Sequence, residues 1–265
     1  MRHRYNIKHC IIIGSSSGLG AALVEEFLNQ TSCRITGVAR TNFEKIHRYR
    51  EWSASGRYNH IELDITSPVC RIHLKSLCSE FSSEPICVIF NAARVATDVN
   101  KNGALNYDVF ADINRVGIDG FGNILAAFEE HFLKYGGILV GISSFSSFMP
   151  PLLEQRVAYP SSKAYLDMAF RCLRVAWDKK VKIVIIHLGH ISYSKDKTFP
   201  KWISPTYNLV AKKIVRLIAS GKAPQEINYP VLYCLIYKYI FRFIPDRVYL
   251  NLLGILRYFI KTDKR

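Results

Sequence analysis

The sequence lacks the features that mark several large protein classes. It has no internal repeat, no low-complexity tract, no linker rich in Pro, Gly or Ser, and no Cys-x-x-Cys pair. Its seven cysteines are scattered, mostly in apolar surroundings, which predicts reduced core residues and excludes a disulfide framework or a cysteine metal site. The basic N-terminus lacks the longer apolar region of a signal peptide. We therefore expect a single cytoplasmic domain that holds no metal.

Acidic residues are scarce compared with basic ones. The chain has 21 Asp and Glu against 36 Lys and Arg, a formal net charge of +15. Such a charge suits an anionic cofactor, an acidic membrane surface or a nucleic acid. Zinc-finger spacing, a basic helix with heptads and an aromatic RNA-binding motif are all missing from the sequence, so we expect no nucleic-acid partner.

A glycine-rich turn stands near the start of the chain. Residues 10–14 are apolar and β-branched and predict a strand, and residues 21–29 predict an amphipathic helix. The turn between them allows a tight bend, and the N-terminus of the helix offers free N–H groups to a pyrophosphate. We expect a dinucleotide to contact this turn at Gly14, Ser16, Ser17, Gly18, Leu19 and Gly20.

The strand predicted over residues 34–39 ends in Arg40. This position, about 20 residues beyond the glycines, usually holds an acidic residue that binds the ribose hydroxyls of NAD. An arginine can instead bind a 2′-phosphate in a bidentate manner. Arg40 therefore predicts a preference for NADP, with NAD as the second choice; the alternative is a plain surface arginine.

The later segments continue to alternate between strands and helices. Strands are predicted to end at residue 66 and to span residues 86–90, 137–143 and 181–187, with helical segments over 107–135 and 159–177. This order predicts right-handed crossovers and a Rossmann-type doubly wound parallel sheet in a three-layer α/β/α domain. Ligands bind such sheets at the carboxyl ends of the strands. Asp64 would either cap the next helix or face the adenine.

Tyr159 and Lys163 are four residues apart on a predicted helix and therefore share one face. A lysine ammonium within roughly 4–6 Å favours the tyrosine phenolate, so this pair could transfer protons. By itself the spacing also fits a chance aromatic anchor beside a solvated lysine. Ser143 and Ser144, at the end of a predicted strand, could hold a substrate oxygen. Asn114 would either satisfy local backbone groups or hold a water beside the active site.

Taken in order, these motifs resemble those of the classical short-chain dehydrogenase/reductase family over roughly residues 8–230. The matching positions are Gly14, Gly18, Gly20, Asp64, the segment Asn91-Ala92-Ala93, Asn114, Ser144, Tyr159 and Lys163. The resemblance implies that Tyr159 is the general acid, that Lys163 lowers its pKa and holds the nicotinamide ribose, and that Ser144 orients the carbonyl. Asn114 would complete a water-linked proton path without a metal.

The resemblance carries further expectations. Cofactor contacts are implied at Asp64, Ile65, Asn91, Ala92, Tyr159, Lys163, Gly189 and Ile191. Ser143 is the alternative for the serine role and Ser146 a weaker one. A small carbonyl or alcohol substrate and a homodimer or homotetramer also fit the family.

The chain departs from the family pattern at three places around the expected cofactor. Ile13 replaces a hydroxyl residue before the first glycine, Ala93 replaces a glycine and is followed by Arg94, and Leu188 replaces the proline before Gly189. Ser192 and Ser194 are candidate substitutes for a threonine that contacts the carboxamide. We thus expect an NADP(H)-dependent oxidoreductase acting on a carbonyl or secondary alcohol. The alternative is a non-catalytic nucleotide-binding regulator or scaffold.

Beyond the expected catalytic domain, residues 1–230, the chain continues as an extension over residues 231–265. Its two apolar and aromatic stretches, residues 231–244 and 248–260, are separated by Pro245 and Asp246. Both are shorter than the ~20 apolar residues of a transmembrane helix, and Lys238 and Arg242 lie one turn apart. Residues 231–260 predict either a peripheral membrane contact or a lid and subunit contact over the substrate cleft.

Overall fold

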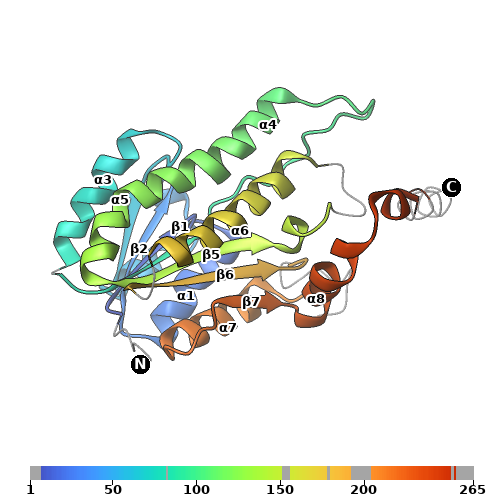
Figure 1. The fold of residues 1–265 in the computed structure, drawn as a ribbon. Coiled ribbons are helices and arrows are strands. Elements are labelled where there is room, and N and C mark those ends of the chain that lie inside the picture. Colours follow the sequence, from blue (N-terminus) through green and yellow to red (C-terminus); the bar gives the residue numbers. More distant parts are fainter. Residues whose placement is uncertain are drawn as a thin grey trace.

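The computed structural model describes residues 7–81, 83–150, 156–177, 180–191, 204–251 and 254. Within this part of the chain, seven parallel strands form one sheet in the order β3-β2-β1-β4-β5-β6-β7 (Figure 1). The strands are β1 (His9–Ile13), β2 (Arg34–Ala39), β3 (Tyr58–Glu62), β4 (Ile86–Phe90), β5 (Gly137–Ser144), β6 (Val181–Leu188) and β7 (Glu226–Tyr229). The predicted Rossmann-type doubly wound parallel sheet is confirmed.

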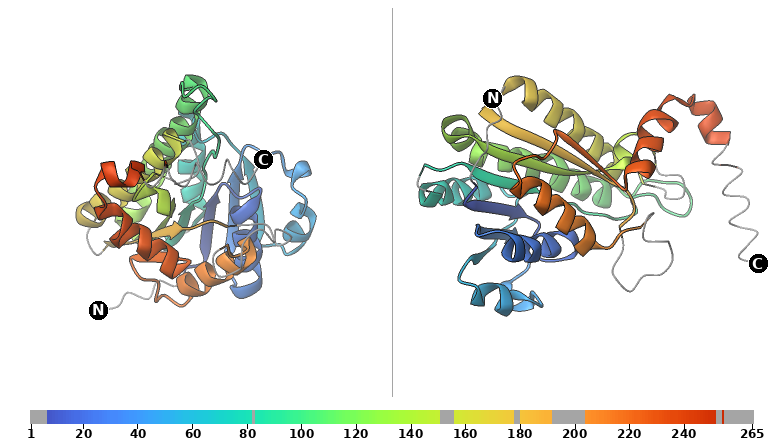
Figure 2. Two further views of the ribbon diagram at one scale, coloured as in Figure 1. Left: turned by 90° about the vertical axis from the view of Figure 1, so that its right-hand side faces the viewer. Right: turned by 90° about the horizontal axis from the view of Figure 1, so that it is seen from below.

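Helices cover both faces of this sheet (Figure 2). They are α1 (Gly18–Gln30), α2 (Tyr49–Ala54), α3 (Val69–Leu77), α4 (Tyr107–Asn114), α5 (Gly120–Tyr135), α6 (Ala158–Ala176), α7 (Tyr207–Ala219) and α8 (Val231–Tyr239). Successive side chains of β1 point to opposite faces: Cys10 and Ile12 pack in the core under α1 and α7, while Ile11 and Ile13 pack under α3, α5 and α6. Such central strands are apolar at every position because both faces are covered.

The prediction places the end of one strand wrongly and omits two elements. The third strand ends at Glu62 instead of residue 66, because the Asp64 carboxylate accepts hydrogen bonds from the Thr66 N–H and hydroxyl, both at 2.9 Å, and turns the chain. The prediction contains neither α7 nor β7. The buried residues of α7 nevertheless recur at helical spacing, as Val210, Ala211, Ile214, Val215 and Ile218.

The helical region predicted over residues 107–135 is present, with one irregular turn inside it. A π-helical turn, Arg115–Asp119, joins α4 to α5 directly after Asn114. Gly117 lies in this turn, and a Cβ there would come within 2.8 Å of the Ser162 Cβ on α6. The missing side chain thus lets the turn approach the helix that carries Tyr159.

All seven cysteines lie in the described part of the chain and are free thiols. Five of them are buried, as a core role predicts. Cys78 is half-buried, and Cys172 on α6 is exposed, so the expectation of a core position is wrong for Cys172.

Candidate active site

A cavity of about 1200 Å³ opens at the carboxyl ends of the parallel strands. Its wall includes most of the residues predicted as site residues: Gly14, Ser16, Ser17, Gly18, Leu19, Arg40, Asp64, Ile65, Asn91, Ala92, Ser143, Ser144, Ser146, Tyr159, Lys163, Gly189 and Ile191. Gly20 and Asn114 are not part of the wall. The structure therefore brings segments separated by more than a hundred residues to one place.

The glycine turn leaves its backbone open to this cavity. Gly14 has a φ of +84°, and a Cβ on it would lie 2.8 Å from the Ala92 Cα. The Asn91 side chain donates a hydrogen bond of 2.8 Å to the Gly14 carbonyl and holds the turn in place. Gly20 lies behind the turn, where a Cβ would fall 1.8 Å from the same carbonyl oxygen. Gly20 thus serves the packing of α1, and its predicted contact with the cofactor stays a prediction.

Three polar side chains line the part of the cavity wall that lies next to the end of β2. Arg40 is exposed and lines the wall together with Thr41 and Ser16. The Thr41 hydroxyl donates a hydrogen bond of 3.2 Å to the Ser16 hydroxyl. Sequence analysis missed Thr41, although its position directly after Arg40 was a usable signal.

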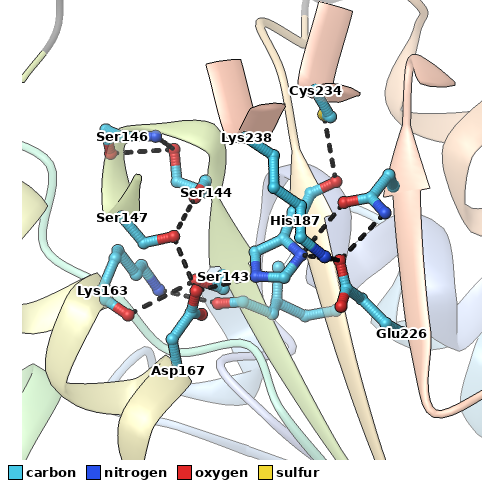
Figure 3. A network of polar contacts seen from close by, with 12 residues as sticks. Ser143, Ser144, Ser146, Ser147, Lys163, Asp167, His187, Glu226, Cys234 and Lys238 are labelled. Atoms are coloured by element: carbon cyan, nitrogen blue, oxygen red, sulfur yellow. Dashed lines mark hydrogen bonds and ion pairs between the residues drawn. The ribbon is translucent and has the colours of Figure 1, made fainter. Parts of the chain in front are cut away.

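The two serines at the end of β5 have different hydrogen-bond partners (Figure 3). The Ser144 hydroxyl oxygen accepts bonds from the Ser146 N–H at 3.2 Å and the Ser146 hydroxyl at 3.0 Å, which leaves its own proton for donation. The Ser143 hydroxyl points to α6 and donates to the Lys163 carbonyl at 3.5 Å. This difference favours Ser144 for contact with a substrate oxygen.

Tyr159 and Lys163 lie one turn apart on α6, as predicted. Lys163 is 5% exposed, and its Nζ donates to the Ile142 carbonyl at 2.8 Å and lies 5.7 Å from the centre of the Tyr159 ring. Burial lowers the pKa of Lys163 to about 8, against the opposing effect of the Asp167 carboxylate. The lysine thus stays largely protonated at neutral pH, beside the tyrosine.

The first turn of α6 is held by a carboxylate that sequence analysis missed. Asp98 is fully buried and accepts hydrogen bonds from the Val157 N–H at 2.9 Å and the Ala158 N–H at 2.7 Å. A negative charge at the N-terminus of a helix satisfies N–H groups that lack a partner within the helix. Asp98 therefore anchors the turn that carries Tyr159.

Asn114 ends α4 beside the π-helical turn. Its Oδ1 is buried, and no hydrogen-bond partner for it lies within the described part of the chain. A buried amide oxygen generally needs such a partner, which a water could supply. The predicted water-holding role of Asn114 fits this environment and stays a prediction.

Comparison with known proteins places the chain in a family. The family model described as short chain dehydrogenase matches residues 8–202. The chain belongs to the short-chain dehydrogenase family. As a member, it is an NAD(P)-dependent oxidoreductase. Among curated proteins, none matches the chain significantly.

Several solved structures share this fold at low sequence identity. A short-chain dehydrogenase from Streptomyces avermitilis has a TM-score of 0.74 at 17% identity, over 97% of this chain and 99% of that one. ElxO with NADP bound has a TM-score of 0.71 at 20% identity, over 86% of this chain and 99% of that one. The NADPH-bound carbonyl reductase from chicken fatty liver has a TM-score of 0.69 at 16% identity, over 84% and 96%.

Helix α8, the first element of the extension in this short-chain dehydrogenase, contributes to the site. Helix α8 is found at the end of the sheet toward which the strand arrows point (Figure 1). Tyr237 on α8 lines the cavity and packs edge-on against Phe145, with ring centres 4.6 Å apart. On the same segment Phe243 is 75% exposed. Helix α8 therefore contributes to the cavity wall, and the predicted membrane contact and the alternative lid and subunit contact both stay predictions.

Some expectations lie outside the described residues. Ser192, Ser194 and most of the stretch 248–260 belong to this group. In the part of the chain that is described, no helix is long and apolar enough to cross a membrane. The same residues contain no cluster of three His, Cys, Asp or Glu side chains that could hold a metal ion.

Proposed function

We propose that this short-chain dehydrogenase uses NADPH to reduce a carbonyl compound to the alcohol, or catalyses the reverse reaction. The observation that supports this most directly is the convergence of Ser144, Tyr159 and Lys163 on one cavity with the glycine turn. The bound cofactor would supply a hydride to the carbonyl carbon. The reaction then needs a proton for the carbonyl oxygen and a group that orients it.

The side chains of the cavity can supply both. The Ser144 hydroxyl would donate a hydrogen bond to the carbonyl oxygen, and the Tyr159 hydroxyl would transfer its proton to the same atom. The Lys163 ammonium, 5.7 Å from the centre of the Tyr159 ring, would stabilise the phenolate that this transfer leaves. Asn114 would hold a water for the return of the proton from solvent. No step requires a metal ion.

The preference for NADP is supported by the end of β2. The open backbone of Gly14 and Gly18 fits a pyrophosphate, and Arg40, Thr41 and Ser16 together offer one cation and two hydroxyls to a 2′-phosphate. The structures of ElxO and of the chicken carbonyl reductase carry NADP or NADPH, whereas another similar structure is a reductase described as NADH-dependent. The proposal of NADP therefore rests on Arg40 and its neighbours.

A tyrosine pair on α6 tests the reaction. Tyr159→Phe removes the proton donor, and we expect kcat with NADPH and a panel of aldehydes and ketones to fall roughly 10²- to 10⁴-fold. Tyr165→Phe is the matched control, because Tyr165 is 41% exposed on the same helix and lies outside the cavity wall. NADPH binding should survive both changes. Native turnover by Tyr159→Phe would refute the mechanism, and NADPH binding without reduction of any carbonyl would favour the non-catalytic alternative.

We also propose that the extension contacts an anionic membrane surface. Val231, Leu232, Tyr239, Ile240, Phe243, Val248 and Leu250 all expose apolar area. From Lys238 to Arg265 the sequence has seven basic and two acidic residues. An apolar, basic surface of this kind suits the boundary between acidic headgroups and acyl chains.

Co-sedimentation with vesicles tests this contact. We expect binding to phosphatidylcholine vesicles that contain phosphatidylserine, weaker binding to phosphatidylcholine alone, and loss of binding in Phe243→Ser. Val175→Ser is the control, since Val175 is 83% exposed on α6. The protein could instead bind neither kind of vesicle, while Phe243→Ser dissociates an oligomer. In that case the apolar surface of the extension is a subunit contact and not a membrane contact. The predicted homodimer or homotetramer is measured in the same samples by light scattering.

A further inference from the structure

A cluster of charged side chains, two of them buried and two half-buried, lies near Lys163 (Figure 3). It joins four elements: Asp167 on α6, His187 on β6, Glu226 on β7 and Lys238 on α8. His187 is 1% exposed and occupies the centre. The mechanism proposed above uses none of these four residues, so the burial of Asp167 and His187 needs a separate explanation.

Each ring nitrogen of His187 has a polar neighbour within hydrogen-bond distance. The Asn228 amide nitrogen donates to Glu226 at 3.0 Å, which turns the Asn228 oxygen toward His187 Nδ1 at 3.1 Å. The other ring nitrogen, Nε2, lies 2.8 Å from the Asp167 carboxylate. Both nitrogens therefore face acceptors, and an imidazole can satisfy two acceptors only when both nitrogens carry protons. This arrangement favours the imidazolium form of His187.

The charges in this cluster alternate. Asp167 and Glu226 are acidic, and His187 lies between them; Lys238 forms an ion pair with Glu226 on the far side. Burial alone lowers the pKa of His187, but its hydrogen bonds to Asp167 and Glu226 outweigh burial and raise it. His187 in turn holds the pKa of Glu226 far below its ordinary value. Pairing of this kind is what allows charges to remain buried.

The cluster also contacts the catalytic end of the cavity. Asp167 follows Lys163 by one turn of α6, and its charge opposes the lowering of the Lys163 pKa by burial. The Ser147 hydroxyl donates to Asp167 at 2.8 Å and lies 2.8 Å from the Ser144 carbonyl. On the other side, Lys238 directly follows the cavity residue Tyr237.

We propose that His187 is a positioning residue: as an imidazolium it holds the Asp167 carboxylate beside Lys163, ties α8 to the catalytic helix, and thereby sets the electric field at Lys163. The groups that face or surround this network are Lys163, Asp167 and Arg174 on α6, Glu226 on β7, Cys234 and Lys238 on α8, and the uncharged Ser147 and Phe148 after β5. The proposal concerns the protein's own residues and does not depend on finding the substrate.

Nuclear magnetic resonance of the full chain tests it without turnover. With ¹⁵N-labelled histidine, assigned by His187→Gln, we expect both ring nitrogens of His187 to be protonated at pH 7. A neutral imidazole at that pH would overturn the proposal. The protonation state is measured on the wild-type protein, and the variant serves only to assign the His187 signals.

Two variants give shifts of opposite sign. With ¹³C-labelled lysine, the titration of Lys163, assigned by Lys163→Met, should move upward by about one pH unit in His187→Gln, because the glutamine amide can still donate to Asp167 and hold it in place while the positive charge is lost. In Asp167→Asn it should move downward by a similar amount, because a negative charge is lost. A residue that only supports the fold would not give opposite shifts. Shifts of the same sign, or none, would overturn the proposal.

Hydrogen exchange tests the link to α8. We expect amides of α8 to exchange faster in Lys238→Gln, which breaks the ion pair with Glu226, and at the wild-type rate in Arg242→Gln. Arg242 is the matched control because it is an exposed cation a few residues away on the same segment. Equal exchange rates in the two variants would refute the claim that the charge cluster ties α8 to α6.

Discussion

Asp98 offers a quantitative test of how α6, the helix that carries Tyr159 and Lys163, is held. Its carboxylate is fully buried and receives the N–H groups of Val157 and Ala158 at 2.9 and 2.7 Å. A hydrogen bond to a charged group contributes roughly 1.5–3 kcal/mol, and loss of a cap costs about 0.5–2 kcal/mol. Asp98→Ala removes both bonds, so we expect the free energy of unfolding to fall by about 3 kcal/mol. In Asp98→Asn the amide oxygen can still accept one bond, and a loss of about half that size follows.

Thermal unfolding followed by circular dichroism measures this effect. For a chain of this size, 1 kcal/mol corresponds to about 2–4 °C in Tm, so Asp98→Ala should lower Tm by about 6–12 °C and Asp98→Asn by about 3–6 °C. The control is Asp108→Ala, because Asp108 is an exposed acid in the first turn of α4 and should change stability by less than about 0.5 kcal/mol. If Asp98→Ala had the same Tm as Asp108→Ala, the idea that the Asp98 carboxylate holds the start of α6 would be refuted.

Three further predictions follow from the same structure. Arg40→Asp should weaken NADPH binding about 10- to 150-fold, from the loss of about 1.5–3 kcal/mol, and favour NADH in a fluorescence titration; Arg34→Asp, at the far end of β2, should change neither affinity. Gly20→Ala should destabilise the protein by about 3 kcal/mol or more, because its Cβ would meet the Gly14 carbonyl oxygen. Gly122→Ala is the control: it has open space around it in α5 and should stabilise the protein by about 0.5–1 kcal/mol. Urea unfolding measures both free energies. Glu226 has a folded-state pKa below its unfolded value, so its contribution is present above about pH 4.3 and is lost as pH falls. Tm should therefore drop more steeply from pH 6 to pH 3 in the wild type than in Glu226→Gln. Parallel curves of Tm against pH would contradict a lowered pKa of Glu226 in the folded protein.

Local patterns explain why much of the fold could be predicted. The glycine turn, the apolar strands and the Tyr159 and Lys163 spacing are each contained in a short window of sequence. The serine pair Ser143 and Ser144 follows from its place at the end of such a strand, although the sequence does not separate the two. These features depend on backbone conformation and helical period, which the residues themselves specify.

The contacts that escaped prediction depend on how distant segments meet. Strand β7 has four residues, two of them polar, and is defined by its pairing with β6. Asp98 reaches its partners 59 and 60 residues further along the chain. His187 meets Asp167 and Glu226 only because α6, β6 and β7 lie side by side in the fold. No local pattern carries that information.

The position of α8 has a consequence for how the protein is made. Lys163 is synthesised about 75 residues before Lys238, a delay of about 4–15 s at ordinary elongation rates. During that interval the emerging chain already contains Asp167, His187 and finally Glu226, but lacks the cation that pairs with Glu226. The ion pairs near Lys163, and the Tyr237 wall of the cavity, can therefore form only when α8 has left the ribosome. A nascent chain that stops short of α8 would contain the predicted catalytic residues with an incomplete charge cluster behind them.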